Sequence, residues 1–278
     1  MPEFRQDPIS KRWVIIASER AHRPRQQSIV AAMSNAQACP FCIGHEDMTP
    51  PEVLADRAGD AAANGPGWNV RVVPNKYPAL TPDSAIPTIS DDLYQARSAI
   101  GVHEVIIEAP DHITNMAALD EPQFERILRA YQQRLRFWHS DKRWHYALIY
   151  KNQGEGAGAS LEHVHSQLIV LPRVPQLAID ELDGVDKHFV ATSRCIYCDV
   201  MKTEVARQAR LILNQDGFVA FCPFAARFPY EVWILPKAHA AAFELGAEEI
   251  IAAAGRALRA VILRLNRALD DPPFNFVI

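Results

Sequence analysis

The chain has no excess of basic residues and no long apolar run. Its 278 residues include 29 Lys and Arg against 33 Asp and Glu, which gives a formal net charge of −4. Without a basic surplus there is no electrostatic footprint for wrapping a nucleic acid. No stretch approaches the roughly 18 apolar residues of a membrane-spanning helix, and the N-terminus lacks the apolar core of a signal peptide. We therefore expect a cytoplasmic protein that acts on neither nucleic acids nor membranes.

Cysteine is scarce, but it is clustered. Four of the five cysteines form two Cys-x-x-Cys pairs, Cys39/Cys42 and Cys195/Cys198. In a reducing compartment such pairs are more often metal ligands or redox pairs than disulfides. A thioredoxin-like redox pair opens a helix after a strand, and neither pair is expected to do so. The pattern favours metal binding, whereas the isolated Cys222 is typical of a buried, inert thiol.

The two halves of the chain repeat the same order of elements. Each contains a Cys-x-x-Cys pair, a strand, a second strand that ends near Pro and His, a long helix and a further strand. Apolar residues at helical spacing predict the helices at about 120–138 and 247–268, and Asp120 is a good N-cap for the first. The predicted fold is α+β, with two tandem halves that each have an antiparallel sheet and a long helix packed on it.

The repeat also divides the chain. Residues 1–175 are predicted to be an N-terminal catalytic half, and residues 191–278 a C-terminal half. Residues 176–190 are predicted to be a linker, because prolines precede this stretch and acidic residues crowd it. The first half continues from its last strand into a glycine-rich loop and a His-x-His strand, but the second half reaches Ile278 before any equivalent. The second half is therefore expected to be incomplete, through loss of that hairpin or truncation of the chain.

The most informative segment for function reads His163-Val-His165-Ser-Gln167. The apolar and β-branched residues that follow it predict a strand. Because side chains alternate along a strand, His163, His165 and Gln167 should share one face. The loop before them is rich in glycine, which lets backbone N–H groups approach an anionic oxygen closely. Together these features indicate phosphate chemistry at a histidine.

Histidines accompany the Cys-x-x-Cys pairs at matching positions of the repeat. Cys39 and Cys42 have the spacing of a zinc knuckle. The repeat nominates His112 as a third ligand, and His163 is the best candidate for the fourth. The corresponding residues of the second half are Cys195, Cys198 and His239. We expect a structural zinc ion at the first set and a second ion at the other, whose fourth ligand would come from the absent hairpin. Buried reduced thiols beside unrelated histidines are the alternative.

If a metal holds His163, then His165 is left on the same face to act as a nucleophile. A neutral imidazole can attack the α-phosphorus of a nucleotide and form a phosphoramidate. The candidate donors for the non-bridging oxygens are Ser160, Gln167, Asn152 and the amides of the loop that reaches Gly158. A core histidine with satisfied hydrogen bonds is the alternative for His165, but the glycine loop and Gln167 beside it favour catalysis.

These residues resemble those of the galactose-1-phosphate uridylyltransferase family of the histidine-triad superfamily, which includes ADP-glucose phosphorylase-like members. The resemblance covers nearly the whole chain. Its most specific stretch runs from Asn152-Gln-Gly through Gly158-Ala-Ser160 to His163-Val-His165-Ser-Gln167. Further matching stretches are Glu19-Arg20, Cys39-Pro-Phe-Cys42, Val73-Pro-Asn-Lys-Tyr-Pro78, Gly101-Val-His-Glu and Ala109-Pro-Asp-His112.

The resemblance implies two histidine-triad-like halves, a homodimer, and a ping-pong reaction. His165 would take a nucleoside monophosphate from a nucleotide sugar, and a hexose 1-phosphate would then accept it. Ser160 and Gln167 match residues that bind phosphoryl oxygens in the family. The residues that match further substrate contacts are Asn75 at the nucleoside, and Arg20 and Arg23 near the active site. Solvated surface positions for the two arginines and a turn role for Asn75 are the alternatives.

Gln167 favours group transfer over hydrolysis. Hydrolases of the superfamily carry a third histidine here, whereas an amide cannot titrate and does not promote attack by water. The leading hypothesis is therefore a galactose-1-phosphate uridylyltransferase. Val164 and Ser166 stand where many uridylyltransferases have Pro and Gly, so an ADP-glucose phosphorylase or a dinucleoside polyphosphate phosphorylase is the alternative. A zinc-stabilised nucleotide-binding protein without turnover is the alternative from another class.

Overall fold

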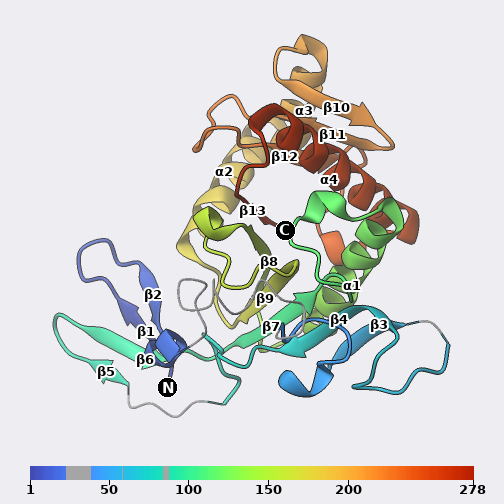
Figure 1. The fold of residues 1–278 in the computed structure, drawn as a ribbon. Coiled ribbons are helices and arrows are strands. Elements are labelled where there is room, and N and C mark those ends of the chain that lie inside the picture. Colours follow the sequence, from blue (N-terminus) through green and yellow to red (C-terminus); the bar gives the residue numbers. More distant parts are fainter. Residues whose placement is uncertain (23–38, 58, 84–87) are drawn as a thin grey trace. The chain divides into compact units, whose positions relative to one another are not determined.

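The computed structural model describes residues 1–22, 39–57, 59–83 and 88–278 (Figure 1). The chain forms two compact units. The first comprises Met1–Ala118, Gln133–Gln176 and Pro273–Ile278, and the second comprises Leu119–Gln132 and Leu177–Pro272. Among the described residues, no helix combines the length and the apolar character that crossing a membrane requires.

The larger sheet of the first unit contains His165 and Gln167, whereas His163 lies just before its strand. Its six strands are antiparallel neighbours in the order β13-β8-β9-β7-β4-β3. They are β3 (Leu54–Arg57), β4 (Trp68–Pro74), β7 (Val102–Ile107), β8 (Tyr146–Gln153), β9 (His165–Leu171) and β13 (Phe274–Val277). All six residues of β7 are buried, as expected of a central strand covered on both faces. The register places His165 opposite Ile107, and Gln167 opposite Val105.

β8 and β13 hold corresponding places in the internal repeat, and they pair with each other. Phe274 lies opposite Gln153, and Val277 lies opposite Tyr150. Beyond the named residues of β13, the backbones of Ile149 and Ile278 exchange hydrogen bonds of 3.0 and 2.9 Å. The strand from the second half of the repeat therefore extends the sheet that contains β9.

The first unit has a second, smaller sheet in the order β2-β1-β6-β5. Its strands are β1 (Glu3–Gln6), β2 (Trp13–Ile16), β5 (Ile89–Ser90) and β6 (Gln95–Ser98). The guanidinium carbon of Arg97 on β6 lies 3.7 Å from the ring centroid of Trp13 on β2, and this cation–π contact ties the two strands together. The 3₁₀ helix η1 (Ser18–His22) follows β2 and carries Arg20.

Helix α1 (Glu121–His139) begins where the sequence predicts. The carboxylate of Asp120 accepts a hydrogen bond of 2.9 Å from the backbone N–H of Gln123, which is the contact of an N-cap. The last part of the helix belongs to the first unit. There Arg134 makes a two-pronged ion pair of 2.6 and 2.8 Å with the buried Glu104 of β7. The helix end is thereby fixed to the strand that neighbours β9.

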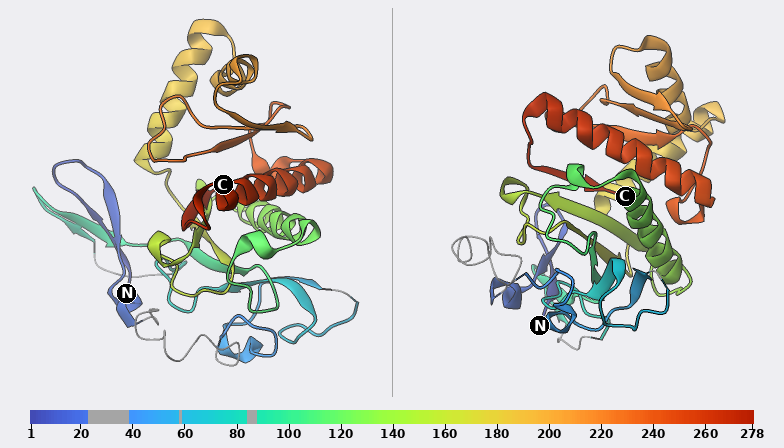
Figure 2. Two further views of the ribbon diagram at one scale, coloured as in Figure 1. Left: turned by 45° about the horizontal axis from the view of Figure 1, so that its top comes forward. Right: turned by 45° about the vertical axis from the view of Figure 1, so that its right-hand side comes forward.

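The second unit packs a long helix on a three-stranded antiparallel sheet of order β10-β11-β12. Its elements are α2 (Gln176–Thr192), α3 (Ile196–Arg207), β10 (Leu211–Gln215), β11 (Phe218–Phe221), β12 (Trp233–Pro236) and α4 (Glu248–Leu269). Ala253, Ala257 and Val261 of α4 share one core with Leu213 and Phe218 of the sheet, and Figure 2 shows the helix running along it. The predicted α+β class and the predicted second helix are confirmed.

The first part of α1 belongs to the second unit and lies close to α4. A side chain in place of Gly255 would put its Cβ 3.2 Å from backbone atoms of Phe124 and Glu125, so glycine permits this approach. The amide of Gln132 donates to the carbonyl of Gly246 at 2.6 Å, at the start of the α4 segment. The two helices that correspond in the repeat are therefore neighbours.

The segment predicted to be a linker, residues 176–190, lies in helix α2. The prolines stand before the helix, where a missing N–H and a fixed φ are tolerated. The helix includes good helix formers such as Leu177, Ala178 and Glu181, and none of its residues is buried, so the acidic side chains remain exposed. Cys195 is the N-cap of α3. This Cys-x-x-Cys pair opens a helix that follows another helix, which agrees with the expectation that it does not open a helix after a strand.

Candidate active site and metal centres

His165 begins β9 and is oriented by the backbone beside it. Its Nδ1 lies 2.8 Å from the carbonyl oxygen of His163, and because a carbonyl can only accept, Nδ1 carries the proton. The neutral ring therefore keeps its lone pair on Nε2. The side chain is buried, and its ring centroid lies 5.2 Å from that of Phe41. An oriented, neutral imidazole with this lone pair can attack phosphorus.

A buried ion pair supports the backbone of His165. Lys151 of β8 and Glu108 are 1% and 0% exposed, and their charged groups are in contact. The Lys151 Nζ also donates to the carbonyl of His165 at 3.0 Å. Burial lowers the pKa of Lys151, and the carboxylate of Glu108 opposes this shift. The pair thus ties the start of β9 to β8.

The structure brings together the four residues that the sequence nominates as the first metal site. The ligand atoms of Cys39, Cys42, His112 and His163 all lie within 4.8 Å of one another. Nδ1 of His163 is 3.5 Å from Sγ of Cys39 and 3.6 Å from Sγ of Cys42. Nδ1 of His112 is 3.4 Å from Sγ of Cys42. These side chains come from separate segments, and together they could hold a metal ion.

The environment of this group suits a cation. Nε2–H of His163 donates to the carbonyl of Ala109 at 2.8 Å, which turns Nδ1 toward the thiols. Burial lowers the pKa of His163 to about 4, so the ring is neutral near pH 7. Burial raises the pKa of Cys42 to about 12, and the charge of Cys39 adds to this. A metal cation reverses such a shift by stabilising the thiolate form.

A second group of residues that could hold a metal ion lies in the second unit. The ligand atoms of Cys195, Cys198 and His239 lie within 4.8 Å of one another, and Sγ of Cys198 is 3.4 Å from Nδ1 of His239. Two ligands come from the start of α3, and the histidine follows β12. The three residues are less buried than those of the first group. Three ligands leave a tetrahedral ion one position short.

Gln167 is held by a histidine that the sequence pattern did not single out. The backbone N–H of Ala79 donates to Nδ1 of His103 at 2.9 Å, so the proton of the neutral ring is on Nε2. That N–H meets Oε1 of Gln167 at 2.8 Å. The hydroxyl of Tyr150 donates to the same oxygen at 3.0 Å. The amide is anchored through its oxygen, and its NH₂ remains a hydrogen-bond donor.

Two of the predicted substrate-binding residues join this group. Nη1 of Arg20 donates to the carbonyl of Tyr77 at 2.5 Å and lies 3.4 Å from Nδ1 of His103. Oδ1 of Asn75 accepts from the backbone N–H of Tyr77 at 2.9 Å, and its Nδ2 lies 3.4 Å from Oε1 of Gln167. Arg20 of η1, Asn75 of the segment after β4, and Gln167 of β9 therefore lie close together.

The glycine loop is shaped by its own backbone and by β13. Gly154 and Gly158 have φ values of +82° and +84°, in the region that glycine adopts without strain. Between them runs the 3₁₀ turn η6 (Glu155–Ala157). Asn275 of β13 donates to Oδ1 of Asn152 at 2.7 Å and to the carbonyl of Ala157 at 2.9 Å. Asn152 therefore helps to brace the loop.

The remaining predicted site residues are placed as follows. Ser160 is half-buried between the loop and β9, and its contact with substrate stays a prediction. Arg23 lies outside the described residues. The supporting residues His103 and Lys151 were missed. His103 and Glu104 interrupt the apolar residues of β7, and Lys151 begins the polar end of β8. A polar residue at such a place in a strand is the signal that could have drawn attention to them.

Comparisons with known proteins agree with this arrangement. Residues 1–175 match the family described as galactose-1-phosphate uridyl transferase, N-terminal domain. An ADP-glucose phosphorylase of Arabidopsis thaliana is 34% identical over 283 residues, which cover 100% of this chain and 78% of the plant protein. A galactose-1-phosphate uridylyltransferase of Thermotoga maritima is 26% identical over 274 residues, which cover 98% of this chain and 78% of that protein.

A solved structure shows that the similarity extends to the fold. A uridylyltransferase superposes with a TM-score of 0.80 at 28% identity, over 99% of this chain and 79% of that one. The matched family covers more than half of the chain, and the Arabidopsis thaliana relative aligns along all of it. The chain therefore belongs to the galactose-1-phosphate uridyl transferase family.

Proposed function

We propose that the protein is a nucleotidyltransferase that moves a nucleoside monophosphate from a nucleotide sugar to a hexose 1-phosphate. In the first step, the lone pair on Nε2 of His165 forms a bond to the α-phosphorus. The bond from that phosphorus to the sugar phosphate oxygen breaks, and the sugar 1-phosphate leaves. In the second step, a phosphate oxygen of the acceptor attacks the same phosphorus, the P–N bond breaks, and the neutral imidazole is restored.

The tautomer of His165 is the observation that carries this proposal. Because Nδ1–H donates to the carbonyl of His163, the ring presents its lone pair without prior loss of a proton. The same carbonyl stabilises the positive charge that the ring gains during attack. The NH₂ of Gln167 donates to a non-bridging oxygen, and since an amide does not titrate, it does not activate water.

Other residues of the site bind the rest of the substrate in this proposal. Ser160 and the backbone amides near Gly158 donate to phosphoryl oxygens. Arg20 carries the one guanidinium that the described residues place beside His103, and it contacts a phosphate. Asn75 contacts the nucleoside. Asn152 acts by supporting the glycine loop.

Covalent labelling tests the reaction. The protein is incubated with UDP-glucose or ADP-glucose that carries ³²P at the α-phosphate, and acid-labile label on the protein is counted. We expect label on the wild-type protein and none on His165→Gly. The exposed His145 is a matched control, and His145→Gly should be labelled like the wild type. Label that persists on His165→Gly would overturn the assignment of the nucleophile.

Two candidate activities differ in the nucleotide and in the acceptor, which is a hexose 1-phosphate for uridylyltransfer and inorganic phosphate for phosphorolysis. Galactose-1-phosphate uridylyltransfer is the first, and label from UDP-glucose alone supports it. ADP-glucose phosphorolysis is the second, because the relative with that activity is 34% identical to this chain and the Thermotoga maritima uridylyltransferase is 26% identical. Label from ADP-glucose alone supports the second. If nucleotide binds but neither sugar gives label, the protein binds nucleotides without turnover and the proposal fails.

We propose that the metal ion is zinc and that its role is structural. Zn–S bonds of about 2.3 Å and Zn–N bonds of about 2.0–2.1 Å in a tetrahedron place S and N atoms roughly 3.5 Å apart. Three of the four S–N distances in the first group are 3.4, 3.5 and 3.6 Å. Cys39, Cys42, His112 and His163 would hold the ion and fix the backbone two residues before His165. Cys195, Cys198 and His239 would hold the second.

A further inference from the structure

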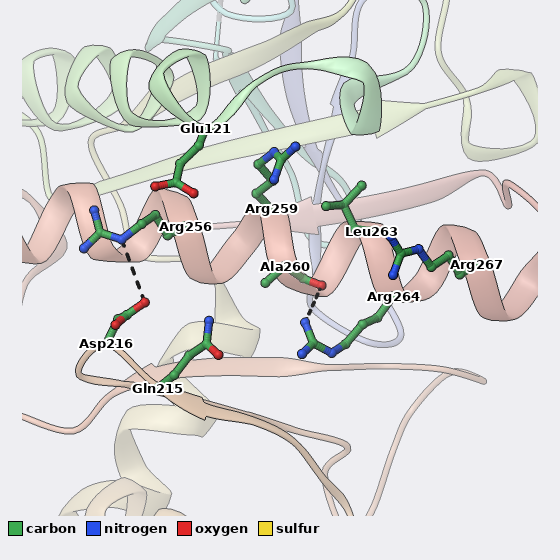
Figure 3. Close-up of a pocket in the computed structure, with 9 residues that line it drawn as sticks. All are labelled: Glu121, Gln215, Asp216, Arg256, Arg259, Ala260, Leu263, Arg264 and Arg267. Atoms are coloured by element: carbon green, nitrogen blue, oxygen red, sulfur yellow. Dashed lines mark hydrogen bonds and ion pairs between the residues drawn. The ribbon is translucent and has the colours of Figure 1, made fainter.

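The second unit has a cavity that the proposed reaction does not use. Its volume is about 370 Å³, and it lies on α4 between the β10–β11 turn and the first turn of α1 (Figure 3). Its basic residues all come from α4 and are Arg256, Arg259, Arg264 and Arg267. Their spacing places them on one side of a helix that turns every 3.6 residues. The residues that line the cavity belong to the second unit, whereas His165 belongs to the first.

One of the four arginines is neutralised. Nη1 of Arg256 lies 2.9 Å from the carboxylate of Glu125 on α1. Its Nε lies 3.9 Å from the carboxylate of Asp216 in the β10–β11 turn. These ion pairs connect α4 to α1 and to the β10–β11 turn, which border the cavity, so Arg256 has a structural role there.

Within the described residues, the other three arginines form no ion pair. Nε of Arg259 donates to the carbonyl of Leu119 at 3.1 Å, and Nη1 of Arg264 donates to the carbonyl of Ala260 at 3.0 Å. These bonds orient the guanidinium groups, but a carbonyl does not neutralise them. Within the part of the chain that the structure describes, Arg267 makes no hydrogen bond or ion pair.

Neither composition nor the helix dipole accounts for this charge. The whole chain carries a net charge of −4, so the cluster does not reflect a generally basic protein. Arg267 lies in the last turn of α4, where a cation complements the dipole. Arg259 lies ten residues before the helix end, outside the reach of that effect. The lining has four arginines against two acids, Glu121 and Asp216.

We propose that this cavity binds a small phosphorylated anion, at a site separate from His165. Guanidinium groups match phosphate oxygens in charge and in bidentate geometry. An anion among Arg259, Arg264 and Arg267 relieves their mutual repulsion. The amide of Gln215 at the edge of the cavity supplies a neutral donor. The volume is within the range of roughly 300–1,000 Å³ that small-molecule sites have.

Binding of inorganic pyrophosphate tests the site. Affinity is measured by isothermal titration calorimetry at 0.15 M salt for the wild type and for Arg264→Gln/Arg267→Gln, whose two side chains are exposed. The matched control is Lys187→Gln/Arg207→Gln, which removes the same charge from exposed positions of α2 and α3. Arginine Nε–H signals in ¹H–¹⁵N spectra report where the ligand sits.

We expect pyrophosphate to bind the wild type, to shift the signals of Arg259 and Arg267, and to bind the pocket variant at least about tenfold more weakly. The control should change by less than about twofold, and labelling of His165 should be unaffected in both variants. Equal losses in the two variants would show a general charge effect and overturn the proposal. Absence of pyrophosphate binding to the wild type would also overturn it. Binding that leaves the arginine signals unshifted would do the same, because the ligand would then sit elsewhere.

Discussion

Nε2 of His103 and Oε1 of Gln167 lie 2.8 Å apart across neighbouring strands β7 and β9. The direction of this bond is decided by a third group, because the backbone N–H of Ala79 occupies Nδ1 of the same ring. An amide that is held by its oxygen cannot rotate by half a turn without losing the bond. His103 is therefore a positioning residue for the Gln167 NH₂.

His103→Phe should slow nucleotidyl transfer without preventing it. Without its main anchor the Gln167 amide can turn, so the rate of His165 labelling should fall by roughly 10- to 100-fold. The loss should appear in kcat rather than in KM, because the ground-state contacts of the nucleotide are retained. Tyr150→Phe, which removes the longer bond to the same oxygen, should cost less. Labelling of His103→Phe at the wild-type rate, with the fold intact by circular dichroism, would contradict the positioning role.

The two Cys/His groups predict the metal content. Elemental analysis of protein purified without chelator should find about one to two zinc ions per chain. Cys39→Ser should lose one ion and unfold at a lower temperature, since a metal ion at this group would link separate segments near His165. Cys222→Ser is the matched control, because Cys222 belongs to neither group. Unchanged zinc content in Cys39→Ser would show that the first Cys/His group does not hold zinc.

Lys151→Met should strongly destabilise the first unit. It leaves the carboxylate of Glu108 buried without its partner, which typically costs about 3–5 kcal/mol of unfolding free energy. Replacing both residues, as Glu108→Leu/Lys151→Met, should recover much of the loss because no buried charge remains. Urea unfolding of the three proteins measures this. A double variant as unstable as the single one would show that packing, not charge, dominates there.

Asn275→Ala should weaken the support of the glycine loop. The variant removes donors to Asn152 and Ala157, and the first labelling step should slow by about two- to tenfold, the equivalent of one hydrogen bond. Val277→Ala is the matched control, because Val277 lies two residues further along β13 on the same face and is also exposed. Equal rates for both variants would show that β13 does not act through the loop.

The sequence predicts those features whose signals are local or repeated. The N-cap at Asp120 and the apolar stripe of α4 lie within the helices that they define, and both helices are confirmed. The metal ligands could be grouped because the repeat presents two comparable sets. The role of His103 could not be foreseen, since Ala79 and Gln167 lie 24 and 64 residues away and meet it only through folding and the register of β7 on β9.

The helix formed by residues 176–190 was not predicted, for a related reason. Proline and acidic residues are typical of connecting segments, but Pro175 stands just before α2 rather than within it. The cavity on α4 could not be predicted from the sequence either. Arginines outside the apolar stripe of a helix are common in sequences of surface helices. That those of α4 line a cavity depends on where α1 and the β10–β11 turn lie against the helix.

The pairing of β8 with β13 determines which strand lies at the edge of the sheet that contains His165. With residues 274–277 in place, the eight-residue strand β8 is bonded on both sides. A chain cut after Pro272 would leave a row of amide and carbonyl groups of β8 facing water. Such an edge is a template for another copy of the protein, so we expect that shortened form to self-associate, and gel filtration across a range of concentrations would detect it.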